Sequence, residues 1–321
     1  MTRVRIGIVS WNTAQMLAEC LSSLPSAAEQ MEVEVVVVDN DSADSSADVA
    51  AGHAGVTVLR NRENVGYARA MNRALSSVPE GDPPDALVAL NPDTVPPPGS
   101  LTALVETLMA QPDVGLVAPR LLNPDGGLQH SVYRFPAPSV SAAACFVPLR
   151  FQHGGVGRRF GLEAGAAHDR RTDIDWAIGA VHVIRTAALG GGPAYNERWF
   201  MYAEDLDLCW RLAQRGWRRV LEPQVAVSHV GNASGVQAWG DLRTGRWLDA
   251  TYDWYRLRHG PSQTRVLAAV NSAGVAYLLG PVLARKAAGR PLQDWQRELP
   301  RAFTHHLRAL LRGGGVAGAA S

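Results

Sequence analysis

The chain has 321 residues, of which 46% are hydrophobic and 19% are charged, and its formal net charge is +1. This length suits one large domain or a domain with an appendage, and the apolar content predicts a packed core. The nearly neutral charge argues against a nucleic-acid partner, which selects a strongly basic surface. The cysteines, Cys20, Cys145 and Cys209, form no close pair, which favours free thiols in a reducing compartment over a disulfide framework.

Strand-like and helix-like segments alternate over the first 120 residues. The run VEVVVVD, which ends at Asp39, is typical of a strand buried on both faces. We expect strands at Val4–Ser10, Val33–Asp39, Val56–Arg60, Asp85–Asn91 and Val114–Pro119, with helices at about 13–24, 66–78 and 96–110 and a short helix after Asp39. Strands that alternate with helices predict right-handed crossovers, and hence an α/β fold with a mostly parallel sheet. The first residues enter a strand without the apolar segment of a signal peptide, so we expect a cytoplasmic location.

The following stretch is less regular. Residues 120–172 contain NPDGG and several prolines, and we interpret them as a hairpin and loops that face a substrate site. Regular patterns return as a strand at Asp175–Arg185 and a helix from Glu204 to Arg215, which Gly216 ends. Two short strands, Arg218–Glu222 and Val225–His229, are expected to complete the sheet.

Composition changes after about residue 240, which divides the chain into a domain at 1–240 and a helical region at 241–321. Val266–Ala284 holds nineteen uncharged residues and barely reaches the length of a bilayer span, so we favour a buried or interfacial helix over a transmembrane one. The basic stretch His305–Arg312 fits contact with an anionic membrane surface, and equally well a solvated helix face. This region could also pack against a second copy. We expect the glycine-rich tail to be disordered.

Polar residues cluster at the predicted carboxyl ends of the strands, where an open α/β sheet binds its ligands. Ser10 to Asn12 follow the first strand, and Asp39 to Ser42 follow the second. A carboxylate after a run of valines is costly unless it has a partner, and a ligand N–H such as N3–H of uracil or thymine would supply one. The alternative is that Asp39 or Asp41 caps the next helix.

Two further strand ends carry groups that could hold a metal ion or a phosphate. Asn91-Pro92-Asp93 lies between a strand and a helix, where Asp93 could give a carboxylate to a divalent cation on a diphosphate. An Asx-type turn that starts the next helix is the structural alternative. His229 ends the last predicted strand and suits a metal or phosphate contact, although a lone histidine is usually structural.

Three carboxylates stand at the start of the helix in FMYAEDLDLCWR. Acids at this position stabilise a helix through its dipole, and Asp207 is four residues before Arg211, which favours a structural ion pair. Glu204 and Asp205 lie nearer the expected cleft, where one of them could act as a general base toward a hydroxyl.

Seven segments in this order resemble the family 2 glycosyltransferases, and within them the bacterial rhamnosyltransferase-like branch. They are IVSWN, VVVVDNDSADSS, NRENVGYARAMNRAL, ALNPDT, WAIGAVHVIRTAAL, RWFMYAEDLDLCWRLAQRGW and PQVAVSHVGNAS, and they cover about residues 4–235. The resemblance implies a GT-A-type sheet flanked by helices, with the C-terminal helices as an appendage.

The resemblance also implies a function for individual residues. Asp205 would be the catalytic base, Asp39 would contact the pyrimidine, and Asp93 with His229 would hold Mg²⁺ or Mn²⁺ on the diphosphate. The remaining candidates for the nucleotide-sugar pocket are Ser10, Asn12, Asp41, Asn64, Gly66, Asn72, Asn91 and Glu204. Asn91 replaces the first carboxylate of the family's DxD motif, a departure that is common in this branch and weakens the case for tight metal binding.

The implied reaction is a single displacement that inverts the anomeric carbon. The resemblance favours dTDP-L-rhamnose as the donor, with a UDP-hexose as the alternative, because thymine and uracil offer Asp39 the same N–H. The acceptor would be a glycan or a polyprenyl-diphosphate-linked sugar, at the inner face of the plasma membrane. A nucleotidyltransferase or an NAD enzyme would need a glycine-rich loop after the first strand, where this chain has SWNTAQ. A catalytically inactive binding subunit would be expected to lose the NPD or ED carboxylates, and both are present.

Overall fold

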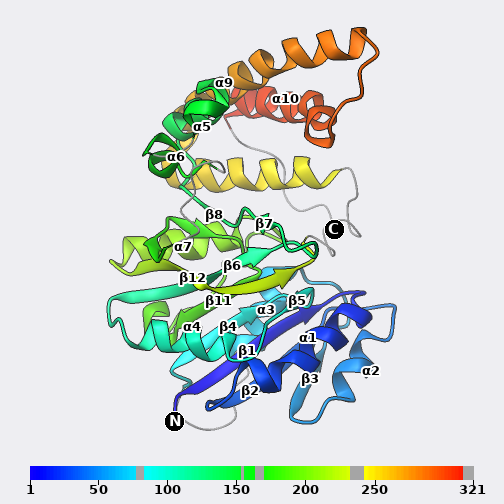
Figure 1. Cartoon of the computed structure of the whole chain (residues 1–321), viewed down its shortest axis with the longest axis vertical. Helices are drawn as coiled ribbons and strands as arrows, with labels where there is room; N and C mark the ends of the chain where they lie inside the picture. Colours follow the sequence, from blue (N-terminus) through cyan, green and yellow to red (C-terminus); the bar gives the residue numbers. More distant parts are fainter. Residues whose placement is uncertain (77–82, 153–154, 163–169, 232–241, 314–321) are drawn as a thin grey trace. The chain divides into compact units, whose positions relative to one another are not determined.

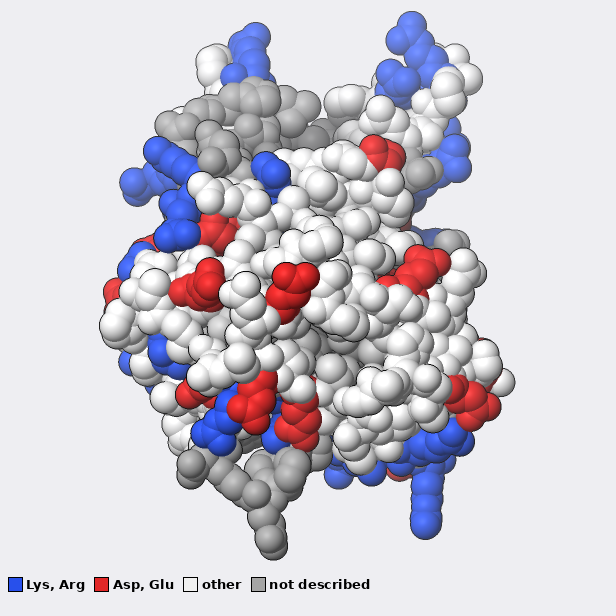
Figure 2. Space-filling view, turned by 60° about the horizontal axis from the view of Figure 1, so that its bottom comes forward, with Lys and Arg blue, Asp and Glu red and all other residues white. Residues whose placement is uncertain are grey.

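The computed structural model describes residues 1–76, 83–152, 155–162, 170–231 and 242–313 (Figure 1). The chain divides into two units, and the predicted disordered tail lies outside the described residues. The first unit comprises Met1–Tyr133 and Ala167–Ala238, and the second comprises Arg134–Ala166 and Trp239–Ser321. Residues 134–166 therefore belong with the C-terminal helices. The predicted division at residue 240 places them in the first domain instead. Acidic and basic side chains are interspersed among uncharged ones on the face in Figure 2, as the small net charge implies.

The first unit is built on a mixed sheet with the strand order β3-β2-β1-β4-β11-β6-β12-β5. The strands of this path are β1 (Arg3–Ser10), β2 (Glu32–Asp39), β3 (Val56–Arg60), β4 (Ala86–Leu90), β5 (Thr94–Val95), β6 (Val114–Leu122), β11 (Val181–Arg185) and β12 (Arg218–His229). Neighbours from β3 to β4 are parallel, as are β6 and β12, whereas β11 is antiparallel to both of its neighbours and β5 is antiparallel to β12. The prediction of a mostly parallel α/β sheet is confirmed.

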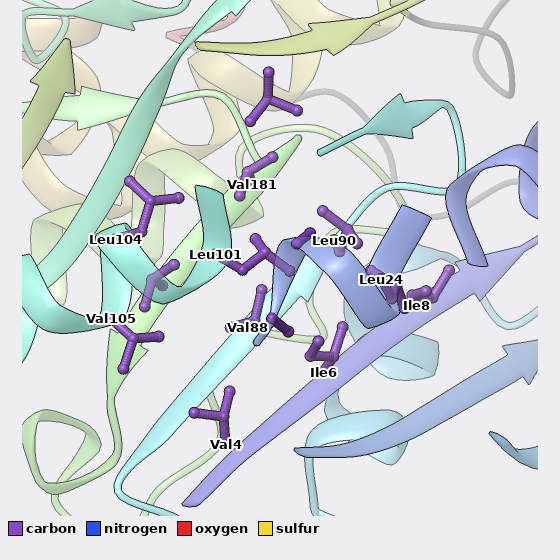
Figure 3. Packing of buried hydrophobic residues seen from close by; sticks show 14 of the residues in the cluster. Val4, Ile6, Ile8, Leu24, Val88, Leu90, Leu101, Leu104, Val105 and Val181 are labelled. Atoms are coloured by element: carbon purple, nitrogen blue, oxygen red, sulfur yellow. The ribbon is translucent and has the colours of Figure 1, made fainter. Parts of the chain in front are cut away.

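Helices cover both faces of this sheet. They are α1 (Ala14–Ala27), α2 (Ser46–Ala51), α3 (Tyr67–Ser76), α4 (Ser100–Met109) and α7 (Glu204–Gln214), with a 3-10 turn at Thr186–Leu189. Leucines of α1 and α4 pack against Ile6, Ile8 and Val88 in one continuous core (Figure 3). Gly7 points to the opposite face, where side chains of α3 fill the space that a larger residue would need. Because β1 is covered on both sides, its central stretch from Ile6 to Val9 is apolar.

Three predicted strands differ from the structure. The expected strand at Asp175–Arg185 is divided into β10 (Trp176–Ala177) and β11, because the residues around Gly179 leave the ladder to contact α7. The two expected final strands are one strand, β12, with a register shift between Glu222 and Ala226. Pro223 lies in that shift, where its missing N–H breaks no ladder bond.

The irregular stretch at 120–172 is shared by the two units. In the first unit, β7 (Leu128–Gln129) pairs with β6, β8 (Val132–Tyr133) pairs with β10, and β9 (Thr172–Asp173) pairs with β12. The second unit contains α5 (Pro138–Phe146), a 3-10 turn at Leu149–Phe151 and α6 (Gly155–Phe160).

The second unit is helical throughout its described part. Its long helix α9 (Arg243–Ala287) bends at Gly260, where φ is 79° and Pro261 follows, and α10 (Asp294–Arg312) packs against it around Val275, Val282 and Leu299. Within the described ranges, α9 is the one helix long and apolar enough to cross a membrane, and 33% of its most apolar window is buried. Core helices of other proteins pass the same test of length and composition, so this finding alone assigns no span.

Candidate active site

The carboxyl ends of the central strands meet at one edge of the sheet. β1 pairs Ser10 with Asp39 on β2, and it pairs Ile8 with Leu90 at the end of β4. On the other side of β4, the N–H of Asn91 donates to the carbonyl of Ala180, which precedes β11. The register therefore places Ser10, Asp39 and Asn91, all three predicted from the sequence, along the same edge.

Asp39 has one carboxylate oxygen that is ready for a ligand. The side chain is 5% exposed, and its Oδ2 lies 3.4 Å from the N–H of Ser42, which donates to it. Oδ1 is buried and has no hydrogen-bond partner among the described residues. Because an unpaired buried carboxylate oxygen is costly, a site that leaves one open is suited to accept a ligand N–H. The alternative that Asp39 only caps the following turn accounts for Oδ2 but leaves Oδ1 unexplained.

Ser10, Asn12 and Asp41 shape the two loops beside Asp39. The hydroxyl of Ser10 is buried and lies 2.7 Å from that of Thr13. Asn12 joins the loops, since its Oδ1 accepts from the N–H of Ala43 at 2.7 Å and its own N–H donates to Ser42. Asn12 and Asp41 both have positive φ, 53° and 68°, as residues of tight turns do, and the Asp41 side chain is exposed.

The loop before α3 and the segment before α7 are held in place by contacts of Asn64, Gly66 and Asn72. The Oδ1 of Asn64 accepts from Asn40 at 2.8 Å and from the N–H of Gly66 at 3.0 Å. The amide of Asn72, which is 7% exposed, exchanges hydrogen bonds with the N–H and carbonyl of Tyr195. These amides are engaged by groups of the protein itself, which is consistent with a positioning function beside the predicted pocket.

Gly66 stands where α3 meets the segment before α7. Its φ is +84°, and a Cβ added here would overlap the carbonyl oxygen of Phe200. The next residue, Tyr67, donates its N–H to that same carbonyl at 2.7 Å. Only glycine combines this backbone conformation with so close an approach.

Asp93 and His229 come together at the end of the sheet. β5 pairs Thr94 with His229, and the N–H of Val230 donates to the carbonyl of Asp93. Asp93 Oδ1 lies 3.3 Å from Nε2 of His229, and both side chains are almost fully buried. Nδ1 of His229 lies 2.6 Å from Oε1 of Gln129, which leaves Nε2 without a hydrogen-bond partner in the described part of the chain. Oδ1 of Asn91 is likewise buried and unpartnered there.

Glu204 and Asp205 begin α7 after a strained turn. Tyr202 and Ala203 have φ of 71° and 66°, two consecutive left-handed residues that are not glycine. Asp205 Oδ1 accepts from the N–H of Leu206 at 2.7 Å, and Oδ2 accepts from that of Gly179 at 3.2 Å. Removal from water raises the pKa of Asp205, although these N–H groups oppose the rise. Burial raises the pKa of Glu204 well above its usual range, and the charge of Asp205 adds to that rise.

Tyr67 connects the ED pair with the NPD loop. Its hydroxyl donates to the carbonyl of Gly179 at 3.2 Å, directly beside Asp205. Burial raises the pKa of Tyr67, and the negative charges of Glu204, Asp205 and Asp93 raise it further. The phenol of Tyr67 therefore lies within electrostatic range of carboxylates from both motifs. By contrast, Asp207 is fully buried and pairs with Arg211 at 2.9 Å, as the predicted structural ion pair.

The model of the family described as Glycosyl transferase family 2 matches residues 6–162. An N-acetylglucosaminyl-diphospho-decaprenol L-rhamnosyltransferase of Mycobacterium tuberculosis is 29% identical over 229 residues, which are 69% of this chain and 74% of that protein. Residues 6–162 of the chain thus form a glycosyltransferase family 2 domain. It is also 29% identical over 199 residues to a pre-mycofactocin glycosyltransferase of the same species, with 61% of this chain and 37% of that protein covered.

A solved structure confirms the GT-A fold of this glycosyltransferase. The mannosyltransferase of Pyrobaculum calidifontis, in complex with GDP-Man and Mn²⁺, superposes with a TM-score of 0.57 at 19% identity. The match covers 96% of this chain and 87% of that one. At this identity the likeness concerns the fold alone.

Several residues of the site were not predicted from the sequence. Gln129, Tyr67 and Gly179 act through contacts with residues distant in the chain, which no local pattern indicates. Arg120 on β6 is another such residue. β11 pairs with β4 on one side, where Val181 is opposite Leu90, and with β6 on the other, where Val183 is opposite Val117. The same register places Arg120 level with Ala180 and Asn91. Its Nε is buried without a hydrogen-bond partner among the described residues. The one available signal was a lone arginine after an apolar strand.

Proposed function

We propose that this glycosyltransferase moves L-rhamnose from dTDP-L-rhamnose to a hydroxyl of a polyprenyl-diphosphate-linked sugar, with inversion. The name of the mycobacterial N-acetylglucosaminyl-diphospho-decaprenol L-rhamnosyltransferase supports L-rhamnose as the transferred sugar and a polyprenyl-diphosphate-linked sugar as the acceptor class. The observation that carries a transfer reaction is the position of Asp205, whose two oxygens are oriented by N–H groups next to the carboxylate of Glu204.

The chemistry that follows is a direct displacement. Asp205 takes the proton of the acceptor hydroxyl as that oxygen attacks the anomeric carbon, and the nucleoside diphosphate leaves from the opposite face. A carboxylate whose pKa lies closer to neutral accepts this proton more readily than an ordinary aspartate. The hydrogen bonds from Gly179 and Leu206 hold the carboxylate in one orientation before the acceptor arrives.

Asp93 and His229 fit a divalent cation, Mg²⁺ or Mn²⁺. Their facing oxygen and nitrogen are 3.3 Å apart, and the hydrogen bond that Nδ1 of His229 donates to Oε1 of Gln129 fixes the imidazole with Nε2 toward Asp93. The described residues contain no cluster of three or more His, Cys, Asp or Glu that could hold a metal, so the diphosphate and water would complete the coordination. When bound, the cation offsets the negative charge that grows on the leaving diphosphate. The unpaired Nε of Arg120 would add a positive charge at the same edge.

The acceptor class would bring the enzyme to the inner face of the membrane. The apolar stretch of α9 and the basic end of α10 support a peripheral contact there. The donor specificity is less constrained, because the open oxygen of Asp39 accepts equally from thymine and from uracil.

Release of nucleoside diphosphate from dTDP-L-rhamnose, UDP-glucose, UDP-galactose and GDP-mannose, with Mn²⁺ or with chelator, tests this proposal. We expect selective turnover of dTDP-L-rhamnose in the presence of the metal and a lipid-linked acceptor. Turnover of a UDP-sugar instead would be compatible with the proposed mechanism but would rule out dTDP-L-rhamnose as the donor.

His229→Ala should raise the Mn²⁺ concentration needed for half-maximal rate about 10- to 100-fold, whereas His53→Ala should leave it unchanged. A protein that binds nucleotide but turns over none of these donors would be a non-catalytic subunit.

A further inference from the structure

A cavity of about 340 Å³ lies between α9 and α10 within the second unit. Three arginines line it, Arg246 from α9 and Arg301 and Arg308 from α10, together with His305. Two carboxylates, Asp249 and Glu298, stand among them. None of the residues named above for the transfer reaction lines this cavity.

The two helices that form the cavity are fixed to each other. Nδ1 of His305 lies 2.8 Å from Oδ1 of Asp249, and the hydroxyl of Thr244 donates to Glu298 at 2.8 Å. A Cβ added at Gly245 would lie 2.5 Å from Nε2 of His305, so the imidazole rests directly on the backbone of α9. Deeper in the unit, the hydroxyl of Tyr252 lies 2.8 Å from Nδ1 of His306. These contacts hold the walls of the cavity in place.

The charges of the cavity favour an anion that also carries hydroxyl groups. The lining has three guanidinium groups and two carboxylates, so positive charges outnumber negative ones. A guanidinium presents paired N–H groups that match the oxygens of a phosphate. The carboxylates are acceptors for hydroxyl groups of the same molecule. A phosphate ester with neighbouring hydroxyls has both features.

Apolar side chains on the same helices point to a lipid as the source of that phosphate. Leu242, which lines the cavity, is 65% exposed, and Trp247 and Leu311 are 41% and 79% exposed. Exposed tryptophan and leucine beside arginine are typical of helices that lie in the headgroup layer. We propose that the cavity between α9 and α10 binds the phosphate ester of an anionic phospholipid headgroup, through residues that include none of those assigned to the donor and independently of the donor's identity.

Binding of the full-length protein to phosphatidylglycerol-containing vesicles tests the site, with pure phosphatidylcholine vesicles as the neutral comparison. Arg308→Gln should weaken vesicle binding about 10-fold or more, because a charge-assisted bond to phosphate contributes about 1.5–3 kcal/mol. Arg290→Gln removes the same charge from an exposed position of the same unit that does not line the cavity. A charge near an anionic surface contributes about 1 kcal/mol, so this control should lose at most about fivefold. Equal losses in both variants would overturn the site.

Arg308→Lys separates a bidentate phosphate contact from simple attraction, because lysine keeps the charge but not the paired donors. We expect it to bind anionic vesicles more weakly than wild type, and wild-type affinity would contradict the proposal. Melting temperatures of all variants identify any that fail to fold, and Arg308→Lys then carries the test. Titration with sn-glycerol 3-phosphate distinguishes the source: binding of this probe without vesicle binding would keep a phosphate site and reject the lipid. If neither probe binds, the proposal is wrong.

Discussion

Asp205 lies in a site that partly excludes water, and this environment sets its affinity for a proton. Removal from water raises its pKa from the usual 3.8 to about 6, so at lower pH the base is protonated and cannot accept the hydroxyl proton. We therefore expect kcat/KM for the acceptor to rise with pH through a limb near 6, and Asp205→Asn to lower kcat about 10²- to 10⁴-fold while dTDP still binds. A rate that is flat from pH 5 to 8, or an active Asp205→Asn variant, would remove Asp205 as the base.

The same shift has a consequence for stability. The folded state holds the proton of Asp205 more tightly than the unfolded state, so the contribution of this group to the free energy of unfolding falls as pH rises from about 4 to about 6. Asp205→Asn removes this dependence. The variant should therefore be at least as stable as wild type at pH 8, and a large loss of stability there would assign Asp205 a structural function instead.

Asp39 is expected to contribute through one oxygen atom. A hydrogen bond from a ligand N–H to the open Oδ1 would involve a charged acceptor and contribute about 1.5–3 kcal/mol. Asp39→Ala should thus weaken dTDP binding about 10- to 100-fold in a calorimetric titration. Asp48→Ala, which removes an exposed carboxylate paired with Arg60, is the matched control and should bind dTDP as wild type does. Equal affinity in both variants would exclude Asp39 from the base contact.

The sequence indicates these carboxylates because each stands at the end of a strand or the start of a helix, where local patterns are informative. It could not indicate Tyr67 or Gly179, since their proximity to Asp205 depends on bonds that join the start of α3, the segment between β10 and β11, and the start of α7. The same limit applies to Asn72, whose amide is matched to the backbone of Tyr195, 123 positions away. The motif groups Asn72 with the predicted pocket residues, and its hydrogen bonds with Tyr195 do not follow from that pattern.

At the level of elements, Gly66 couples the start of α3 to the segment that leads into α7. In Gly66→Ala the alanine would have to adopt a left-handed backbone conformation, and its Cβ would overlap the backbone of Phe200. We expect the free energy of unfolding, measured with denaturant, to fall by about 2–5 kcal/mol. Gly126→Ala has a similar φ, +82°, but nothing within 4 Å of the added Cβ, so it should cost only about 1–2 kcal/mol. If both substitutions cost the same, the contact with Phe200 is not a constraint on the fold.

The elements themselves are largely predictable because their periodicity reflects burial. The valine run of β2 and the apolar β1 are found where the sequence places them, since covered parallel strands need apolar residues on both faces. The errors fall where tertiary contacts decide the boundary. The N–H of Gly179 bonds to Asp205 and not to a neighbouring strand, which interrupts the predicted strand at 175–185. Pro223 suggests the end of a strand, but β12 continues past it through a register shift.

At the level of the whole molecule, the two units have separate cores, one around Ile6 and Val88 and the other around Val275 and Leu299. The predicted nucleotide residues all lie in the first unit. We therefore expect two calorimetric unfolding transitions, of which only one responds to dTDP with Mn²⁺. At a hundredfold excess over Kd, the ligand stabilises its unit by about 2.7 kcal/mol, which corresponds to a shift of about 5–10 °C. The other transition should stay in place and should respond instead to Leu299→Ala, which removes a side chain from the second core. A single transition that moves as a whole with either change would mean that the two cores unfold as one cooperative structure.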